Sequence, residues 1–316
     1  MSLPADVLRR LVASDPGRPR ITVYDDTDSP TRGERVELSA RVVANWVAKA
    51  ANLLQDELDV APGTVVRLDL PPHWRTLYWA LAVWAVGGCV EVPAHRCGSE
   101  ASGARDAGAP ADAGSPSDAS APADGGTTAD AGAPADAAAG SDAAAGSDNG
   151  APADGSATAD AGGTASARPS FPTDVPASVV VTDDPALASL ALGSGGHAVL
   201  VTLAALARSA TSTVPAGAVD EARDLATHGD VFEPWEEPDA HDLALRTPAA
   251  DSAYATLVPA AGTAERVHTE TADTAAFLAL VLEAWAGDGS VVLGRGRVPD
   301  DVLAARLEAE GVTRRA

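Results

Sequence analysis

Lysine is nearly absent from this chain of 316 residues: Lys49 is the only one among 22 basic side chains, and the others are arginines. Any chemistry that needs a lysine amine at another position is therefore excluded. The basic residues are also outnumbered by 45 acidic ones, which gives a formal net charge of −23. This balance argues against nucleic acids and anionic membranes as partners, because their phosphates require Lys or Arg.

Cysteine is equally scarce, with only Cys89 and Cys97. Two thiols cannot build a disulfide framework or a four-thiolate zinc site. His95 is near both in the sequence, and the three residues together could form a metal or thiol site. We favour a buried, free Cys89 and a Cys97 in a loop, because free cysteine behaves mainly as a small apolar residue. None of the six histidines pairs at the spacing of a helical metal site, so we predict no metal.

A long apolar run is also missing. Arg9 and Arg10 interrupt the apolar N-terminal stretch, which therefore lacks the core of a signal peptide. The longest uncharged apolar run, residues 78–90, is too short for a membrane-spanning helix of roughly 20 residues. We therefore expect a cytoplasmic protein in a reducing compartment, with both thiols free.

Residues 101–170 contain no Val, Leu, Ile, Phe, Trp or Tyr, and ten aspartates recur every six residues from Asp106 to Asp160. A hexapeptide β-helix needs an aliphatic residue in each repeat, and alanine alone cannot offset the entropy of ordering the backbone. We predict that residues 98–170 are a disordered insert of low complexity. Two interpretations stay open: a functional acidic tether, or a repeat expansion without a role.

The segments on either side of this insert can belong to one domain. Loop-closure entropy grows only with the logarithm of length, so lengthening a short loop to 70 residues costs roughly 2 kcal/mol. A domain stable by about 5–15 kcal/mol tolerates that cost. We therefore predict that residues 1–97 and 171–316 are the two parts of a single α/β domain.

The folded segments show alternating strand and helix patterns. Ser39 is a plausible N-cap for an amphipathic helix whose apolar positions recur over residues 42–58. Further helices are expected at 74–86, 271–285 and 299–310, and strands at 21–25, 34–38, 65–70, 90–92, 178–182, 253–258 and 290–293. Residues 185–192, 197–201, 203–209 and 219–227 follow as alternating helix-like and strand-like pieces. This alternation predicts a mixed or parallel sheet layered with helices.

Several stretches resemble, in order, the N-terminal part of the acyl-adenylate-forming enzymes, the AMP-binding, acyl-CoA synthetase-like superfamily. The segment from LSA (38–40) to NLL (52–54) is similar to the family's first helix, and VAPGTVV (60–66) to its "V-x-PGD-x-V" turn and strand. WALAVWAVGGCV (79–90), followed by VP (92–93), is similar to its "LA-x-x-x-AGA-x-x-x-P" segment. Near the end, AWAGDGSVVL (284–293) and LEAEGVT (307–313) resemble the segment after the family's phosphate loop. The whole also resembles a shortened, uncharacterised actinobacterial branch.

The resemblance implies activation of a carboxylate with ATP, whose phosphates lie in a loop of the form "TSGTTG-x-PKG". The matching residues 260–269 read AAGTAERVHT. Only Gly262 and Thr263 match; the second glycine, the proline and the lysine are absent. Glu265 adds a negative charge there, and Arg266 is no equivalent of a lysine. We therefore take Gly262, Thr263 and Arg266 as a vestigial phosphate loop.

The family's adenylation step uses a lysine in a C-terminal lid domain, whereas Lys49 is in the first helix. The family's acyl-pocket, adenine and magnesium motifs would follow Ala316. The resemblance therefore implies a degenerate, non-catalytic binding or scaffold module without catalytic residues or a bound cofactor, apart from a vestigial ATP or AMP site. It would act with a protein partner or as a homo-oligomer. Two alternatives are a half-enzyme of an AMP-forming acyl ligase, completed by a partner chain, and a small-molecule carrier.

Other motifs are weaker. The sequence GSGG at 193–196 lacks the G-x-S-x-G spacing of a nucleophile elbow. The sequence GRGR at 294–297 follows a strand and could bind an anion, although a surface turn is the simpler interpretation. Trp74, Trp79 and Trp84 are expected in the core. Trp235, among acidic residues of a solvated loop, is a candidate partner contact if exposed.

Overall fold

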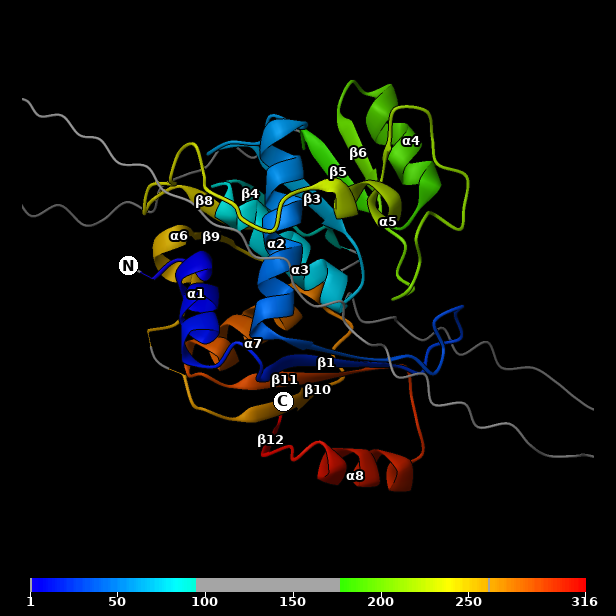
Figure 1. The fold of residues 1–316 in the computed structure, drawn as a ribbon, viewed down its shortest axis with the longest axis vertical. Coiled ribbons are helices and arrows are strands. Elements are labelled where there is room, and N and C mark those ends of the chain that lie inside the picture. Colours follow the sequence, from blue (N-terminus) through cyan, green and yellow to red (C-terminus); the bar gives the residue numbers. More distant parts are fainter. Residues whose placement is uncertain (1, 95–176, 261) are drawn as a thin grey trace, which may run out of the picture. The chain divides into compact units, whose positions relative to one another are not determined.

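The computed structural model describes residues 2–94, 177–260 and 262–316, and their strands form two sheets (Figure 1). The first sheet has five strands in the order β12-β10-β11-β1-β2. All its neighbours are parallel except the hairpin of β1 and β2. Its strands are β1 (Pro19–Asp25), β2 (Arg35–Ser39), β10 (Arg266–Thr269), β11 (Ser290–Arg295) and β12 (Arg314–Arg315).

The second sheet has seven strands in the order β7-β6-β5-β3-β4-β8-β9, with only β8 and β9 antiparallel. Strand β3 pairs with β5 and β4 pairs with β8, so segments on both sides of residues 98–170 build one sheet. The predicted disordered insert itself is outside the described residues. The strands are β3 (Val65–Asp69), β4 (Cys89–Glu91), β5 (Val179–Thr182), β6 (His197–Leu200), β7 (Val219–Asp220), β8 (Leu243–Arg246) and β9 (Asp251–Ala253).

Helices layer these sheets, which confirms the predicted mixed α/β class. None of the helices in the described segments combines the length and apolar character needed to span a bilayer. The helices are α1 (Pro4–Ser14), α2 (Ala40–Asp56), α3 (Trp74–Ala85), α4 (Pro185–Gly193), α5 (Glu221–Asp224), α6 (Tyr254–Leu257), α7 (Thr274–Ala286), α8 (Asp300–Ala309) and the 3₁₀ turn η2 (Leu225–Thr227).

Helix α3 is packed between the two sheets, contacting β1 on one side and β3 and β4 on the other (Figure 1). Every residue of α3 except Ala85 is buried. Trp74, Trp79 and Trp84 are at most 3% exposed, which confirms their predicted place in the core. A helix that is apolar on nearly all sides must be covered on all sides, and here the two sheets supply that cover together with α2 and α1.

Capping side chains account for the N-terminal ends of α2 and α7. The Ser39 hydroxyl accepts a hydrogen bond from the Val42 N–H at 3.4 Å, as predicted for the N-cap of α2. Asp273 caps α7 in the same way, through Ala276 at 3.0 Å. These caps satisfy N–H groups that have no partner within the helix.

Several elements differ from the sequence-based expectations. Residues 203–209 are turns rather than a regular element, and the expected strand at 253–258 is mostly helix α6. Arg75 donates to the Ala204 carbonyl at 2.8 Å, and this oxygen also accepts the Ala207 N–H of a turn at 3.4 Å. Helix α1 and strands β8, β10 and β12 were not foreseen.

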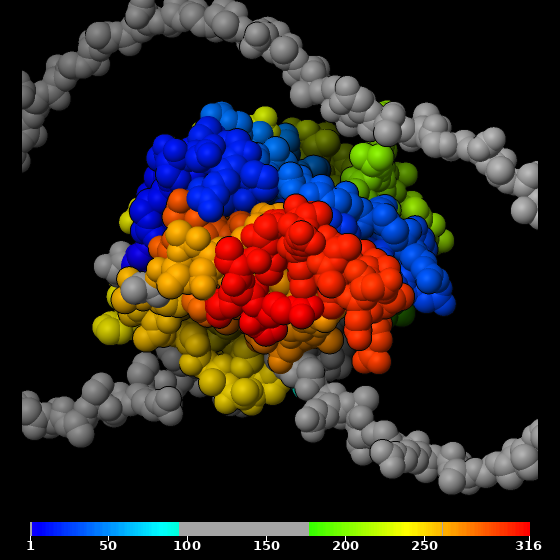
Figure 2. Space-filling model, turned by 90° about the horizontal axis from the view of Figure 1, so that it is seen from below, coloured from blue at the N-terminus to red at the C-terminus, as the bar shows by residue number. Residues whose placement is uncertain are grey.

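Helix α8 is attached by polar contacts, since none of its side chains is buried. In Figure 2 this red C-terminal segment occupies the middle of the face, beside blue N-terminal residues. Arg306 lies 3.9 Å from the centroid of the Tyr24 ring and pairs with Asp26 at 2.7 Å. Just after the helix, Glu310 pairs with Arg35 at 2.7 Å and with Arg266.

A buried ion pair connects α3 to the far edge of the second sheet. The Arg75 guanidinium is 2.5 Å from the Glu221 carboxylate, and the two side chains are 2% and 0% exposed. The Tyr78 hydroxyl also donates to this carboxylate. Burial raises the pKa of Glu221, and the charge of Arg75 opposes that rise. Because both side chains are buried, each charge is stabilised by the other rather than by water.

We expect Glu221→Leu to lower the free energy of unfolding by about 3–5 kcal/mol, because it leaves the Arg75 charge buried without its partner. The double variant Arg75→Met/Glu221→Leu removes both charges and should be more stable than the single variant. Urea denaturation of the full chain measures both. A double variant at least as unstable as Glu221→Leu alone would contradict this account.

The second prediction concerns acid sensitivity. Burial, followed by the charges of Arg295 and Arg75, holds the pKa of His73 well below its usual value, while Asp25 opposes the shift. The unfolded chain binds a proton near pH 6.5 and the folded chain does not, so stability falls as the pH drops below that value. One such group changes the free energy of unfolding by up to about 1.4 kcal/mol per pH unit.

His73→Asn keeps an acceptor for the Arg75 N–H, which His73 Nδ1 accepts at 3.3 Å, but removes the titration. We therefore expect its unfolding free energy to fall less than that of the parent between pH 6.5 and 5, as measured by urea denaturation. The exposed His197, changed to Asn, is the control and should track the parent. If the unfolding free energies of His73→Asn and the parent fall in parallel as the pH is lowered, His73 is not the group that causes the acid sensitivity.

Candidate functional site

The loop in the position of the phosphate loop, residues 262–265, lies directly on the turn between α7 and β11. A Cβ added to Gly262 would be 2.3 Å from the Glu283 carbonyl oxygen, and one added to Gly287 would be 2.3 Å from the Thr263 nitrogen. At Gly289 the Glu265 oxygen would be at 2.4 Å. These glycines are required because two backbones touch, leaving no space between loop and turn at these points.

The electrostatics of this contact are unfavourable for phosphate. The loop meets the C-terminal end of α7, where carbonyl oxygens carry the negative end of the helix dipole. Anions bind at the opposite end of a helix, where N–H groups point outward. The Glu265 N–H is also already bonded, to the Thr263 carbonyl at 2.7 Å.

The loop side chains bond to one another and to β12. The Thr263 hydroxyl donates to the Glu265 carboxylate. Glu265 in turn pairs with Arg314 at 3.1 Å. The hydroxyl that would contact a phosphate oxygen is thus paired with an acid, and that acid is itself paired with Arg314.

Arg266 turns away from the loop into an internal cluster. Its guanidinium donates to the Thr22 hydroxyl at 2.9 Å and pairs with Glu310. Burial alone raises the pKa of Glu310, but hydrogen bonds from Tyr24, Arg35 and Arg266 outweigh it and hold that pKa at about 2. The structure therefore keeps Gly262 and Thr263 in one loop and directs the Arg266 charge to α8.

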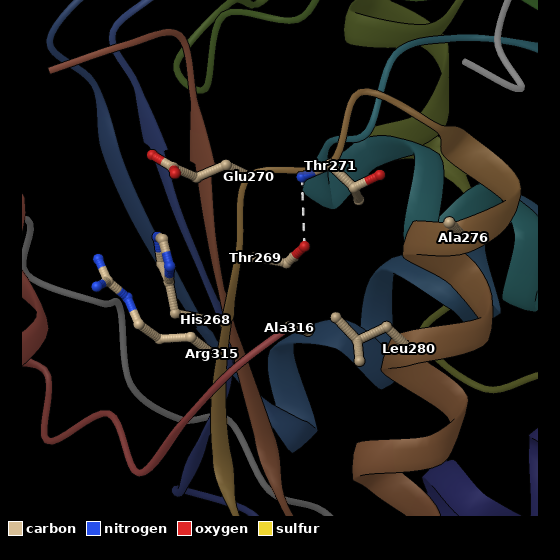
Figure 3. A pocket seen from close by; sticks show the side chains of 8 residues that line it. All are labelled: His268, Thr269, Glu270, Thr271, Ala276, Leu280, Arg315 and Ala316. Atoms are coloured by element: carbon tan, nitrogen blue, oxygen red, sulfur yellow. Dashed lines mark hydrogen bonds between the residues drawn. The ribbon is translucent and has the colours of Figure 1, made fainter. Parts of the chain in front are cut away.

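A second candidate site, missed in the sequence, lies at the other end of β10 (Figure 3). It is a pocket of about 430 Å³ next to His268, a residue only 3% exposed. His268 Nε2 is buried and has no hydrogen-bond partner among the described residues. Burial lowers the pKa of His268, so its ring is neutral at pH 7, although Glu270 opposes the shift.

Successive side chains of β10 point to opposite faces of the sheet, which separates the polar groups beside this pocket. Figure 3 shows His268, Glu270 and Arg315 on one side of the strand, whereas Thr269 points to the other side, toward Leu280. The Thr269 hydroxyl accepts a hydrogen bond from the Thr271 N–H at 3.3 Å. Among the described residues, Nε2 of the His268 imidazole is paired with no hydroxyl or thiol, so the pocket shows no nucleophile activated through this nitrogen.

The remaining predicted sites are accounted for separately. Burial raises the pKa of the Cys89 thiol to about 12, so it is neither a nucleophile nor a ligand at neutral pH. His95 and Cys97 are outside the described residues. Within the described segments, no three His, Cys, Asp or Glu side chains are grouped to hold a metal. Arg295 of the GRGR sequence pairs with Asp25 at 2.5 Å, which uses the charge an anion would need.

Trp235 is 75% exposed, as a partner contact requires. Val231, in the same segment, is 79% exposed. In the sequence, this surface was indicated by Trp235, an aromatic residue among prolines and acidic residues.

Comparison with known proteins gives a relative by sequence and further relatives by fold. No family model matches the chain. The "TIGR03089 family protein" of Mycobacterium tuberculosis is 45% identical over 86 residues, which are 27% of this chain and 34% of that protein. The match therefore spans about a third of the relative's length.

Solved structures of adenylate-forming enzymes match almost the whole chain at low identity. Acetoacetyl-CoA synthetase of Streptomyces lividans has a TM-score of 0.57 at 15% identity, covering 99% of this chain and 42% of its own. An acyl-CoA synthetase of Brucella canis gives 0.56 at 13%, covering 98% and 46%. The amide bond synthetase McbA of Marinactinospora thermotolerans gives 0.51 at 12%, covering 99% and 48%.

The chain spans less than half of each of these three enzymes. At such identities the likeness concerns the fold and not the chemistry. The chain therefore has the fold of an AMP-binding, acyl-CoA synthetase-like N-terminal domain.

Proposed function

We propose that this chain is a non-catalytic binding or scaffold module built on the adenylate-forming fold. The observation that supports the proposal is the contact of residues 262–265 with the end of α7. A phosphate loop needs free N–H groups and space for oxygens. Here Gly262 packs against the Glu283 carbonyl, the Glu265 N–H is bonded to the Thr263 carbonyl, and the Thr263 hydroxyl is bonded to Glu265.

The alternative, a half-enzyme completed by a partner chain, needs the same loop to hold the phosphates. A partner could supply a lid lysine, but it would have to pull residues 262–265 off the turn at Gly287 and Gly289. It would also have to release Arg266 from Glu310. We therefore favour the module without a nucleotide cofactor.

Gly262→Ala tests the packing on which the proposal depends. Its Cβ would meet the Glu283 oxygen at 2.3 Å, so we expect the free energy of unfolding to fall by about 1–3 kcal/mol or more. Gly193→Ala, in α4 with no atom within 4 Å of its Cβ, is the matched control and should be neutral or stabilising by up to about 1 kcal/mol. Equal stability of the Gly262→Ala variant and the parent, in urea denaturation, would show that the loop is free.

Carboxylate-dependent ATP–pyrophosphate exchange by the purified full chain tests the function itself. We expect no exchange above the enzyme-free blank with pooled aliphatic, aromatic and amino acids. We also expect no heat of binding for magnesium-ATP in titration calorimetry. Exchange that requires a carboxylate and is abolished by Arg266→Ala would overturn the proposal and favour an active ligase.

A further inference from the structure

An apolar groove of about 740 Å³ lies between α1, α2, the end of α3 and the segment 230–238. In Figure 1 this segment is the yellow chain that passes in front of α2, with α1 beside it. The groove is far from the phosphate-loop position in the sequence and shares no lining residue with residues 262–265. Its apolar lining includes Leu8, Val12, Val47, Ala85, Val231 and Phe232.

The wall formed by residues 230–238 is held in place by α2. Lys49, Asn52 and Gln55, which share one side of the helix, donate to main-chain oxygens of residues 228–233 at 2.6–3.3 Å. Gln55 also accepts from the Trp235 N–H at 2.9 Å. These bonds satisfy the backbone of the segment on its inner side, so the exposed Val231 and Trp235 side chains belong to a built surface.

The rim of the groove is acidic. Asp6, Asp230 and Glu237 line it, and Arg9, the only cation in the lining, pairs with Asp6 at 2.8 Å. Asp230 is paired with Lys49 at 2.9 Å, outside the lining. Glu237 has no ion-pair partner among the described residues, and Glu233 and Glu236 add two more unpaired acids to the same segment.

Charge and composition argue against two occupants. A second copy carries the same net charge of −23 and would bring acids to an acidic rim. Residues 101–170 of this chain are acidic and lack any large apolar side chain, so they offer nothing to fill the groove. An occupant that complements this groove therefore carries both aliphatic anchors and basic residues.

The backbone of the groove determines the form of that occupant. Its walls are helices, whose N–H and C=O groups bond internally, and a segment whose oxygens bond to α2. No strand edge is in the lining, so an extended peptide would find no ladder of partners. A helix satisfies its own backbone and can place side chains at i, i+3, i+4 and i+7 into a groove.

We propose that this groove binds a basic amphipathic helix of a partner protein, with aliphatic side chains in the groove and Lys or Arg against Glu237 and its neighbouring acids. The proposal rests on the function proposed above in one respect: it names the partner of the binding module. The two can fail separately, because ATP–pyrophosphate exchange would leave the groove intact, and loss of helix binding would leave the occluded loop intact.

Fluorescence anisotropy with labelled helical peptides of 18 residues tests the proposal on the full chain at physiological salt. The first peptide has leucine on one face of the helix and lysine on the other. The second, a matched control, has glutamate in place of every lysine. We expect the lysine peptide to bind at least about tenfold more tightly than the glutamate peptide. A third peptide, with serine in place of leucine, should bind as weakly as the glutamate peptide, because charge alone is screened by salt.

Matched variants separate the groove from general attraction to an acidic protein. Val231→Ser and Glu237→Lys should each weaken the lysine peptide by about fivefold, a change near 1 kcal/mol. The same substitutions at Leu206, which is 90% exposed, and at Glu308 of α8 should change binding less than twofold. Absence of binding, equal binding of the glutamate or serine peptide, or equal effects of the control variants would each overturn the proposal.

Discussion

Helix α3 has no side that faces solvent, and this constraint determines where both sheets can lie. Its aromatic and aliphatic residues need cover on all sides, which α2 and α1 provide together with β1 of the first sheet and β3 and β4 of the second. The single charge on the helix, Arg75, is neutralised by Glu221 from α5. Because the second sheet draws strands from both sides of residues 98–170, the buried helix also joins two segments that are distant in the sequence.

Packing against the end of α7 changes the meaning of the one motif that matched the phosphate loop. Gly262 matches the family pattern, but here its missing side chain lets the loop backbone touch α7, which is a structural need. A glycine can satisfy a motif for either reason, since close approach of a phosphate and close approach of a second backbone both exclude a Cβ. The neighbouring residues decide between the two: Thr263 and Glu265 bond to each other, and Arg266 balances Glu310.

Sequence reasoning succeeded where periodicity and burial agree. The expected helix at 74–86 and the strand at 178–182 correspond to α3 and β5, because one is apolar throughout and the other is a short aliphatic run. Strand β10 was missed since RVHT alternates charged, apolar and polar residues, and both His268 and Thr269 are buried in spite of their polarity. The pocket beside His268 was therefore invisible too. No local pattern shows that a histidine will be buried by the strands on either side of it.

Lys49, the single lysine of the chain, lies beside the groove and binds the segment that forms one of its walls. Lys49 Nζ is 2.6 Å from the His228 carbonyl and 2.9 Å from Asp230, so it holds one wall of the groove rather than a phosphate. An arginine in its place would present a planar fork instead of a compact ammonium with three donors. Apart from the histidines, every other basic side chain is an arginine. At this position the compact ammonium of Lys49 contacts the His228 carbonyl and the Asp230 carboxylate at the same time. The acids further along the segment, Glu233, Glu236 and Glu237, have no such cation among the described residues. In the proposed complex, their charge is therefore the part of the groove that would pair with a basic partner helix.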